Sequence, residues 1–372
     1  MAINESPSGA PADQEAVDPA ALEELIHRVI GDAGGALILP LALLGDRLGL
    51  FSALASGGPV TAEGLAQRTG LNERYLREWL LAMAAAGYVT YARANGDPSP
   101  RAARYRLSPE QAEAFTNPDS PGYVAGGFQN LSAATRMLDR LTEAFRTGAG
   151  IGWHEQHPDM FEGTERFFRP GYLANLTTSW IPSLTGVESR LTAGARVADV
   201  GCGFGASTII MAKAYPNSTF EGVDYHQPSI ESARHRAAAA GVADRVTFRV
   251  AGAADLVGNY DLITFFDCLH DMPDPVGALG AARAATAEGG SVMLVEPMSW
   301  DSVEETLNPL GKLMAGASTF ICLPSGLSSE PAYGMGNQAG PATTCEVARE
   351  AGFSDARIAA SSDFNHVYEL RF

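Results

Sequence analysis

Lysine, cysteine and net positive charge are all scarce in this chain of 372 residues. It has two lysines, Lys213 and Lys312, and four cysteines, and 43 acidic side chains outnumber 26 basic ones to give a formal net charge of −17. Nucleic acids and anionic membrane surfaces attract proteins mainly through basic faces. The charge therefore argues against nucleic-acid and membrane partners and favours work on a small molecule.

The cysteines and the apolar runs exclude further classes of protein. The cysteines have neither the paired spacing of a disulfide framework nor that of a zinc site, so we expect free thiols in a reducing compartment. The first twenty residues lack the basic segment and apolar core of a secretory signal. The apolar run 36–44 is broken by Pro40 and is too short to cross a bilayer. These features predict a cytoplasmic protein without a membrane span.

Residues 197–207 form the most informative stretch. A short apolar run, typical of a buried parallel strand, ends in alternating glycines and passes directly into an apolar helix. Glycines let the backbone adopt positive φ and let a ligand approach main-chain N–H groups at a helix N-terminus. Here they fall as G-x-G-x-G at Gly201, Gly203 and Gly205, after Asp199, whereas a dinucleotide fingerprint reads G-x-G-x-x-G. The spacing disfavours a nicotinamide oxidoreductase, which stays as an alternative.

A second strand end narrows the choice of ligand. The next apolar run, 218–223, ends in Asp224, where a carboxylate can hold both hydroxyls of a ribose. Capping of the following helix is the alternative role for this acid. Together the two strand ends resemble the class I S-adenosylmethionine (SAM) dependent methyltransferases, whose first motif is an acid followed by G-x-G-x-G and whose second strand ends in the ribose-binding acid. The resemblance implies SAM as the methyl donor and S-adenosyl-L-homocysteine (SAH) as the product, with Asp199, Gly201 and Gly203 at the methionine end and Asp224 on the ribose.

Strands and helices alternate over residues 191–372 as in a doubly wound sheet. The predicted strands are 196–200, 219–223, 246–250, 262–266 and 291–295, and the helices between them include 206–214, 227–240 and 275–286. A final helix at 345–351 precedes two runs, 356–360 and 365–372, that suit a hairpin. A methyltransferase sheet ends in such an antiparallel strand. We therefore predict an α/β fold with a Rossmann-like class I methyltransferase sheet whose last strand is antiparallel.

The N-terminal part predicts a smaller domain of another type. Residues 1–18 are rich in Ser, Pro, Gly and acids without periodicity, as in a disordered tail. Over 19–108, two or three helices are followed by helices 62–68 and 73–86, capped by Thr61 and Asn72, and by a β-hairpin at 88–92 and 104–107 that is joined by a polar loop at 95–100. This order is that of a winged helix-turn-helix.

A winged helix suggests DNA binding, but the charges of its second helix argue against that function. Glu73 and Glu78 cancel Arg74 and Arg77, although the wing adds further arginines. Small-molecule O-methyltransferases, by resemblance, carry such a domain as a dimerisation module that also closes over the partner's active site. We therefore expect a homodimer without a nucleic-acid partner, and a SAM-sensing DNA-binding regulator is the alternative.

Residues 109–190 predict a helical, aromatic-rich segment between the two domains, where pockets tend to form. Phe168 and Tyr172 are candidates for the wall around the methyl donor, although aromatic stripes more often pack in a core. His154 and His157 have an H-x-x-H spacing, but a proline follows them and no third ligand is apparent. No metal site is expected.

The ends of the later strands hold the residues expected to carry the chemistry, since ligands of an open α/β sheet lie outside the carboxyl ends of its strands. By resemblance, Ala253 and Ala254 flank the adenine and Asp267 lies near the cofactor. His270 and Asp271 resemble the His-Asp that follows the fourth strand in caffeate- and hydroxyneurosporene-type O-methyltransferases, where that His is the general base. Those enzymes commonly read His-Asp-Trp, whereas this chain reads His-Asp-Met.

Methyl transfer to a hydroxyl requires alignment of the acceptor and removal of its proton. A histidine with its ordinary pKa near 6.5 is largely neutral near pH 7 and can take that proton. His270 is therefore the expected base, and Glu296, at the end of strand five, could hold its imidazole in one tautomer. Asp271 is expected to cap the helix that begins near 273. The alternative for His270 is a hydrogen-bonded residue with no proton to transfer.

The sequence therefore predicts a SAM-dependent methyltransferase of secondary metabolism that methylates a hydroxyl of a small, aromatic or otherwise apolar metabolite. Transfer to carbon or nitrogen is the alternative, since positioning alone could suffice there. The glycine- and proline-rich segment 308–341 predicts an irregular loop over the active site. Met298, Met314 and Phe320 would suit an apolar acceptor.

Overall fold

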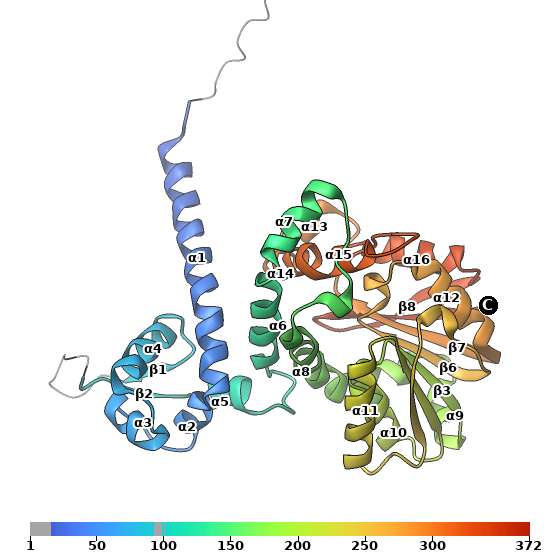
Figure 1. Cartoon of the computed structure of the whole chain (residues 1–372), viewed down its shortest axis with the longest axis horizontal. Helices are drawn as coiled ribbons and strands as arrows, with labels where there is room; N and C mark the ends of the chain where they lie inside the picture. The colour runs from blue at the N-terminus through green and yellow to red at the C-terminus, as the bar shows by residue number, and fades with distance from the viewer. Residues whose placement is uncertain (1–15, 93–98, 100) are drawn as a thin grey trace, which may run out of the picture.

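The computed structural model describes residues 16–92, 99 and 101–372 as a small N-terminal domain, a group of connecting helices and a C-terminal α/β domain (Figure 1). The predicted tail, apart from residues 16–18, lies outside the described residues. The predicted wing loop at 95–100 also lies outside the described residues, apart from residue 99.

The N-terminal domain contains the capped helix pair and the hairpin that its sequence predicts. Its elements are α1 (Pro19–Arg47), α2 (Leu50–Ala55), α3 (Ala62–Thr69), α4 (Glu73–Ala85), β1 (Thr90–Ala92) and β2 (Arg104–Arg106). The Thr61 hydroxyl accepts a hydrogen bond from the Gly64 N–H, and Asn72 Oδ1 accepts one from the Arg74 N–H. Both caps satisfy N–H groups that a first helical turn leaves without partners. β1 and β2 pair antiparallel.

Both basic residues of α4 are paired within that helix. Arg74 pairs with Glu78, and Arg77 pairs with Glu73 at 3.4 Å. In a DNA-binding winged helix, α4 would be the helix that enters the DNA groove. Both of its arginines already pair with glutamates of the same helix, which argues against contacts with DNA phosphates.

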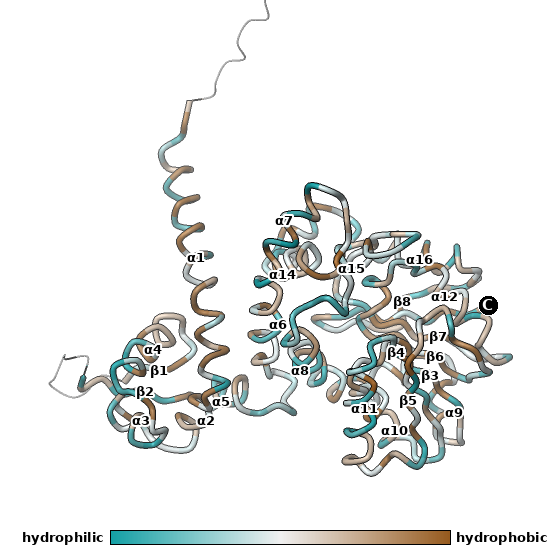
Figure 2. Tube along the Cα trace, viewed as in Figure 1, coloured by the Kyte–Doolittle hydropathy of each residue, from teal (hydrophilic) through white to brown (hydrophobic). Residues whose placement is uncertain are grey.

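The N-terminal part of α1 extends away from the rest of the chain (Figure 1), and one face of the helix is apolar and exposed (Figure 2). The exposed apolar side chains recur at the spacing of helical turns, and we call them the α1 stripe: Leu22, Leu25, Ile26, Val29, Ile30 and Leu37. Length and composition alone would let α1 cross a membrane, a property shared by some helices of soluble proteins. The apolar run 36–44, judged too short to cross a bilayer, is only part of this helix of 29 residues.

The connecting segment is helical, as predicted, and includes α5 (Pro109–Thr116), α6 (Ala125–Thr135), α7 (Leu138–Thr147), α8 (Pro158–Asn175) and α9 (Val187–Ala193). The backbones of α6 and α8 lie in contact. A Cβ at Gly163 would lie 2.6 Å from the Asn130 nitrogen, so only glycine permits this approach. The contact brings Asn130 Nδ2 to within 2.6 Å of the Thr164 hydroxyl.

The C-terminal domain is built on a seven-stranded sheet in the order β5-β4-β3-β6-β7-β9-β8, in which β9 runs antiparallel to its neighbours. The strands are β3 (Arg196–Val200), β4 (Thr219–Asp224), β5 (Val246–Val250), β6 (Tyr260–Phe266), β7 (Thr286–Pro297), β8 (Asp355–Ser361) and β9 (Asn365–Arg371). The helices on its faces include α10 (Ala206–Ala214), α11 (Gln227–Ala239), α12 (Pro275–Ala285) and α16 (Gly340–Glu350). The predicted sheet and its closing hairpin are present, although β7 begins before 291 and α16 before 345.

The segment 308–341 is helical in its first half, so the prediction of an irregular loop is wrong there. It follows α13 (Val303–Thr306) and holds α14 (Pro309–Ala317), a π-helical turn at Ser318–Cys322 and α15 (Leu323–Gly326). Asn308 Oδ1 accepts the Gly311 N–H and caps α14. Pro309 and Pro324 lie in the first turns of α14 and α15, where proline starts a helix instead of breaking it. Ile321 and Cys322 then pack against α6 and α8.

Candidate active site

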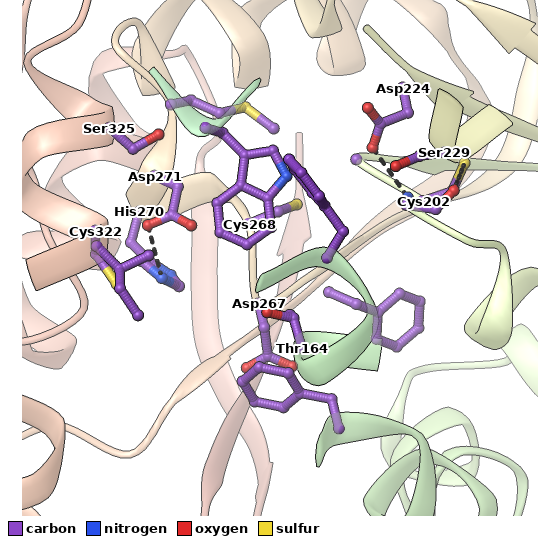
Figure 3. A pocket seen from close by; sticks show the side chains of 18 of the residues that line it. Thr164, Cys202, Asp224, Ser229, Asp267, Cys268, His270, Asp271, Cys322 and Ser325 are labelled. Atoms are coloured by element: carbon purple, nitrogen blue, oxygen red, sulfur yellow. Dashed lines mark hydrogen bonds and ion pairs between the residues drawn. The ribbon is translucent and has the colours of Figure 1, made fainter. Parts of the chain in front are cut away.

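A cavity of about 600 Å³ lies at the carboxyl ends of β3, β4 and β6, with residues of α6, α8 and α14 in its wall. Polar side chains face each other across it (Figure 3). On the glycine-loop side lie Cys202, Asp224 and Ser229, and on the histidine side lie His270, Asp271, Cys322 and Ser325, with Asp267 and Thr164 between them. The strand ends that the sequence singles out therefore meet in one cavity.

The glycine loop has the backbone conformation that its sequence predicts. Gly201 and Gly203 have φ of 70° and 51°, which side chains rarely tolerate. A Cβ at Gly201 would lie 2.7 Å from Cys268 Sγ, whereas no atom lies within 4 Å of a Cβ built on Gly203, which lines the cavity. Gly205, at φ 78°, is the N-cap of α10. The loop thus leaves space for a ligand beside a helix N-terminus.

Asp224 is fixed at the end of β4 by two main-chain donors. Its Oδ2 accepts the Gly203 N–H at 2.9 Å, and its Oδ1 accepts the His226 N–H at 2.8 Å. Burial raises the pKa of this carboxyl, and the two N–H groups oppose that rise. Because a carboxylate has about four acceptor positions, two remain for the hydroxyls of a ribose. Ala253 and Ala254, after β5, also line the cavity.

Asp199 differs from its predicted place at the methionine end of the donor. It is almost fully buried, is not among the residues that line the cavity, and accepts hydrogen bonds from the hydroxyls of Ser207, Thr208 and Thr264. Its side chain points beneath the glycine loop and ties β3 to the first turn of α10. Asp199 therefore positions the loop from outside the cavity lining.

Asp267 lies between the two sides of the cavity, in a strained conformation with φ of 50°. Tyr172 Oη donates to its Oδ2 and Asn365 Nδ2 to its Oδ1, both at 2.7 Å. Burial raises the pKa of Asp267 to about 7; the Tyr172 hydrogen bond opposes this rise, and the Glu296 charge adds to it. Phe168 stacks on Tyr172 with ring centroids 6.2 Å apart, and both line the cavity. The aromatic pair and the acid therefore lie together at the cavity, and their contact with the donor stays a prediction; no sequence signal points to Asn365.

His270 and Glu296 form a buried pair on the histidine side. The carboxylate of Glu296, behind the ring on β7, accepts a hydrogen bond from His270 Nδ1. His270 Nε2 lies 3.3 Å from Asp271 Oδ1. Burial alone lowers the pKa of His270, but the charges of Glu296 and Asp271 outweigh it and raise that pKa well above its ordinary value. The imidazole is therefore more basic than the near-neutral histidine that the sequence predicts.

Asp271 is not a helix cap, contrary to expectation. Asp274 Oδ1 accepts the Gly277 N–H and caps α12, which leaves the Asp271 carboxylate beside His270 in the cavity. Cys322 and Asn337 complete this side: Asn337 Nδ2 contacts Cys322 Sγ at 3.4 Å. Burial raises the pKa of the Cys322 thiol to about 12. Neither residue lies in a motif, so no local sequence pattern points to them.

The two histidines of the H-x-x-H stretch do not converge on one point. His157 accepts the Asp159 N–H as the N-cap of α8, and its other ring nitrogen contacts Arg136. His154 packs edge-on against Tyr225 and lines the cavity. Met314 also lines the cavity, while Met298 and Phe320 are not among its lining residues.

Two family models match this chain. Residues 191–335 match the family described as "Methyltransferase domain", and residues 35–117 match "Rv2258c-like winged HTH domain". The first match includes residue 196, where the predicted sheet begins, and the second includes residue 62, where the predicted helix pair begins.

Curated relatives match somewhat more than a third of this chain. Ubiquinone biosynthesis O-methyltransferase of Bordetella avium is 34% identical over 133 residues, which are 34% of this chain and 52% of that protein. The 27-O-demethylrifamycin SV methyltransferase of Amycolatopsis mediterranei is 31% identical over 149 residues, 38% of this chain and 54% of that one. The chain thus spans about half the length of these relatives.

Solved structures match along nearly the whole chain at low identity. Mitomycin 7-O-methyltransferase MmcR aligns with a TM-score of 0.68 and 18% identity over 95% of this chain and 98% of that one. Human N-acetylserotonin methyltransferase in complex with SAM aligns with a TM-score of 0.70 and 17% identity over 96% and 99%. At such identities the likeness establishes the fold. Residues 191–335 thus match a methyltransferase domain, residues 35–117 match a winged helix-turn-helix domain, and the whole chain has the fold of two-domain methyltransferase structures.

Proposed function

We propose that the chain is a SAM-dependent methyltransferase that transfers a methyl group to a hydroxyl of a small, apolar metabolite. The observation that carries this proposal is the His270–Glu296 pair, which faces the glycine loop and Asp224 across one cavity. The rifamycin and ubiquinone methyltransferases among its relatives support transfer to oxygen.

The residues on the glycine-loop side fit SAM. The space beside Gly203 suits close approach of a ligand to main-chain N–H groups, Asp224 has acceptor positions for the ribose, and Ala253 and Ala254 leave room for the adenine. Phe168 and Tyr172 would wall the donor beside Asp267. When bound, SAM supplies a methyl group on an electrophilic sulfonium, so the protein has to align the acceptor and take its proton.

His270 would take that proton at Nε2. Its Nδ1–H is held by Glu296, so the lone pair of the neutral ring is on Nε2, and the same carboxylate stabilises the imidazolium once the proton has moved. The acceptor hydroxyl would therefore lie at Nε2, on the histidine side of the cavity.

The lining of the cavity indicates an acceptor without an anionic group. No lysine or arginine is among the described residues that line it, whereas Glu165, Asp271 and Glu330 are. A carboxylate or phosphate on the acceptor would have no lysine or arginine to pair with there. Apolar side chains that include Trp153, Phe161, Leu313, Met314 and Ile321 also line it. A neutral aromatic or aliphatic hydroxyl compound of secondary metabolism fits this wall.

We also propose that the chain forms a homodimer, and the α1 stripe supports this part of the proposal. Isolated helices are marginally stable in water, so a long helix with an exposed apolar face gains stability when a partner covers it. A second copy presents the same face and would cover it symmetrically.

Calorimetry with SAM and SAH on the purified chain, together with His270→Ala, tests this function. We expect both ligands to bind, and we expect the variant to keep SAM affinity while methyl transfer falls by about 10²–10⁴-fold. Absence of binding heat with either ligand would exclude the methyltransferase. Transfer to the true acceptor that survives within a few-fold would exclude His270 as the base.

One observation favours a second candidate, transfer to carbon or nitrogen. Because the pKa of His270 is raised, its imidazolium form persists to higher pH and could hold an acceptor through a hydrogen bond without removing a proton. Identification of the methylated atom by NMR of the product distinguishes the two.

A further inference from the structure

The histidine side of the cavity holds three different metal-ligating atoms at one point. His270 Nε2, an Asp271 carboxylate oxygen and Cys322 Sγ all lie within 4.8 Å of one another. Figure 3 shows the three side chains together, two from the turn after β6 and one from the π-helical turn after α14. These atoms converge on one small volume.

A fourth polar group is buried at this point without a partner. Asn337 is 7% exposed, its Nδ2 contacts Cys322 Sγ, and its Oδ1 makes no hydrogen bond. Asp271 Oδ1 is also buried, and its contact with His270 Nε2 at 3.3 Å is an ion pair only when the ring is protonated. Buried oxygens without partners are costly, and a bound cation would satisfy them.

The hydrogen bond behind the imidazole is the one that metal-binding histidines make. Glu296 accepts from Nδ1, which fixes the tautomer and leaves the Nε2 lone pair directed at Asp271 and Cys322. A set of one nitrogen, one carboxylate oxygen and one sulfur suits Zn²⁺, and the cavity leaves an open fourth position. Hard cations such as Mg²⁺ prefer oxygen ligands and would bind poorly to this set.

We propose that His270, Asp271 and Cys322 form a site for a thiophilic divalent cation, Zn²⁺ above all, and that its occupation inhibits methyl transfer. The cation occupies the Nε2 lone pair that would otherwise take the acceptor's proton, and the proton of the Cys322 thiol leaves to solvent as the Zn–S bond forms. SAM would bind across the cavity, at the glycine loop, and is retained. The inhibition rests on the proposed role of His270 as the base; the cation site does not.

The test uses the full-length chain, freed of metal by a chelator and titrated with Zn²⁺ by calorimetry and with Co²⁺ as a spectroscopic probe. We expect one equivalent of Zn²⁺ and a Co²⁺–thiolate charge-transfer band. Cys322→Ala and Cys322→Ser should lose the band and bind Zn²⁺ at least about tenfold more weakly. Cys345→Ala is the matched control, because that thiol is free, partly exposed and bonded to the Ala356 carbonyl outside the cavity. It should behave as the unmodified chain does.

The ratio of methyl-transfer rates without and with Zn²⁺ is the second measurement. It should be at least about tenfold for the unmodified chain and Cys345→Ala and near one for folded Cys322 variants. Absence of the Co²⁺–thiolate band, equal inhibition of all variants, or a requirement for the metal in catalysis would overturn the proposal. If the chain transfers methyl groups but binds no Zn²⁺, the cation site fails and the methyltransferase stands. If it binds Zn²⁺ but not SAM, the proposed function fails instead.

Discussion

At the scale of single residues, Glu296 sets the pH range in which His270 can accept a proton. The carboxylate lies behind the ring and is one of two charges that raise the pKa of His270. A base with a raised pKa is protonated, and therefore inactive, up to a higher pH than an ordinary histidine. Methyl transfer in the unmodified chain should thus increase with pH beyond the usual range of histidine titration.

We expect Glu296→Gln to lower the pKa of His270, since it removes a negative charge that favours the imidazolium. The rising limb of the kcat/KM profile should move to lower pH, and the maximal rate should fall at least about tenfold because the tautomer is no longer fixed. Steady-state kinetics from pH 5 to 9 measure both effects. The base assignment would be wrong if the limb stayed in place or moved to higher pH.

The single residues also mark where sequence reasoning ends. Asp224 and His270 line the cavity because each follows a parallel strand at its carboxyl end. Asp199 belongs to such an end too, but its side chain points beneath the loop to three hydroxyls, and the spacing of the motif does not encode that direction. Asn337 and Cys322 reach His270 from a segment far along the chain, and no local pattern announces such contacts.

At the scale of elements, α6 and α8 hold one wall of the cavity through the contact at Gly163. We expect Gly163→Ala to lower the free energy of unfolding by about 1–3 kcal/mol, because its Cβ would lie 2.6 Å from the Asn130 nitrogen and the helices would have to separate. Gly171→Ala, on the same helix, is the matched control, because no atom lies within 4 Å of its Cβ. It should be neutral or stabilising by up to about 1 kcal/mol. Denaturant titrations compare them, and equal stabilities would contradict this packing.

Elements with local signals were predicted well, and those that depend on distant packing were not. α3 and α4 begin at caps, and β3 and β5 lie where short apolar runs stand between turn residues. α14 and α15 were missed because a segment rich in glycine and proline reads as irregular. Their prolines lie in first turns, and the π-helical turn between the two helices packs Ile321 and Cys322 on α6 and α8. The contact between α6 and α8 could not be predicted from the sequence. Gly163 permits the close approach of the two helices only because the Asn130 backbone lies opposite it, and no local pattern shows that neighbour.

At the scale of the whole molecule, the α1 stripe would form the seam between two copies. If two stripe side chains are buried there at about 1.5–3 kcal/mol each, replacing both by aspartate should weaken association at least about 100-fold. Leu25→Asp with Val29→Asp places two charges one helical turn apart within the stripe. Sedimentation equilibrium should then show monomers at concentrations where the unmodified chain is dimeric.

The matched control adds the same two charges at the same spacing on another face of α1. His27→Asp with Gly31→Asp should leave the dimer intact, because both positions are exposed and lie outside the stripe. A chain that is monomeric without any substitution, or that dissociates equally with both pairs, would show that the stripe is not the seam. Because length and composition would also let α1 enter a bilayer, flotation with lipid vesicles tests a membrane role for this helix. If the stripe is a dimer interface, the chain should not associate with vesicles. If α1 is a membrane anchor, the chain should associate with them, and only Leu25→Asp with Val29→Asp should abolish the association.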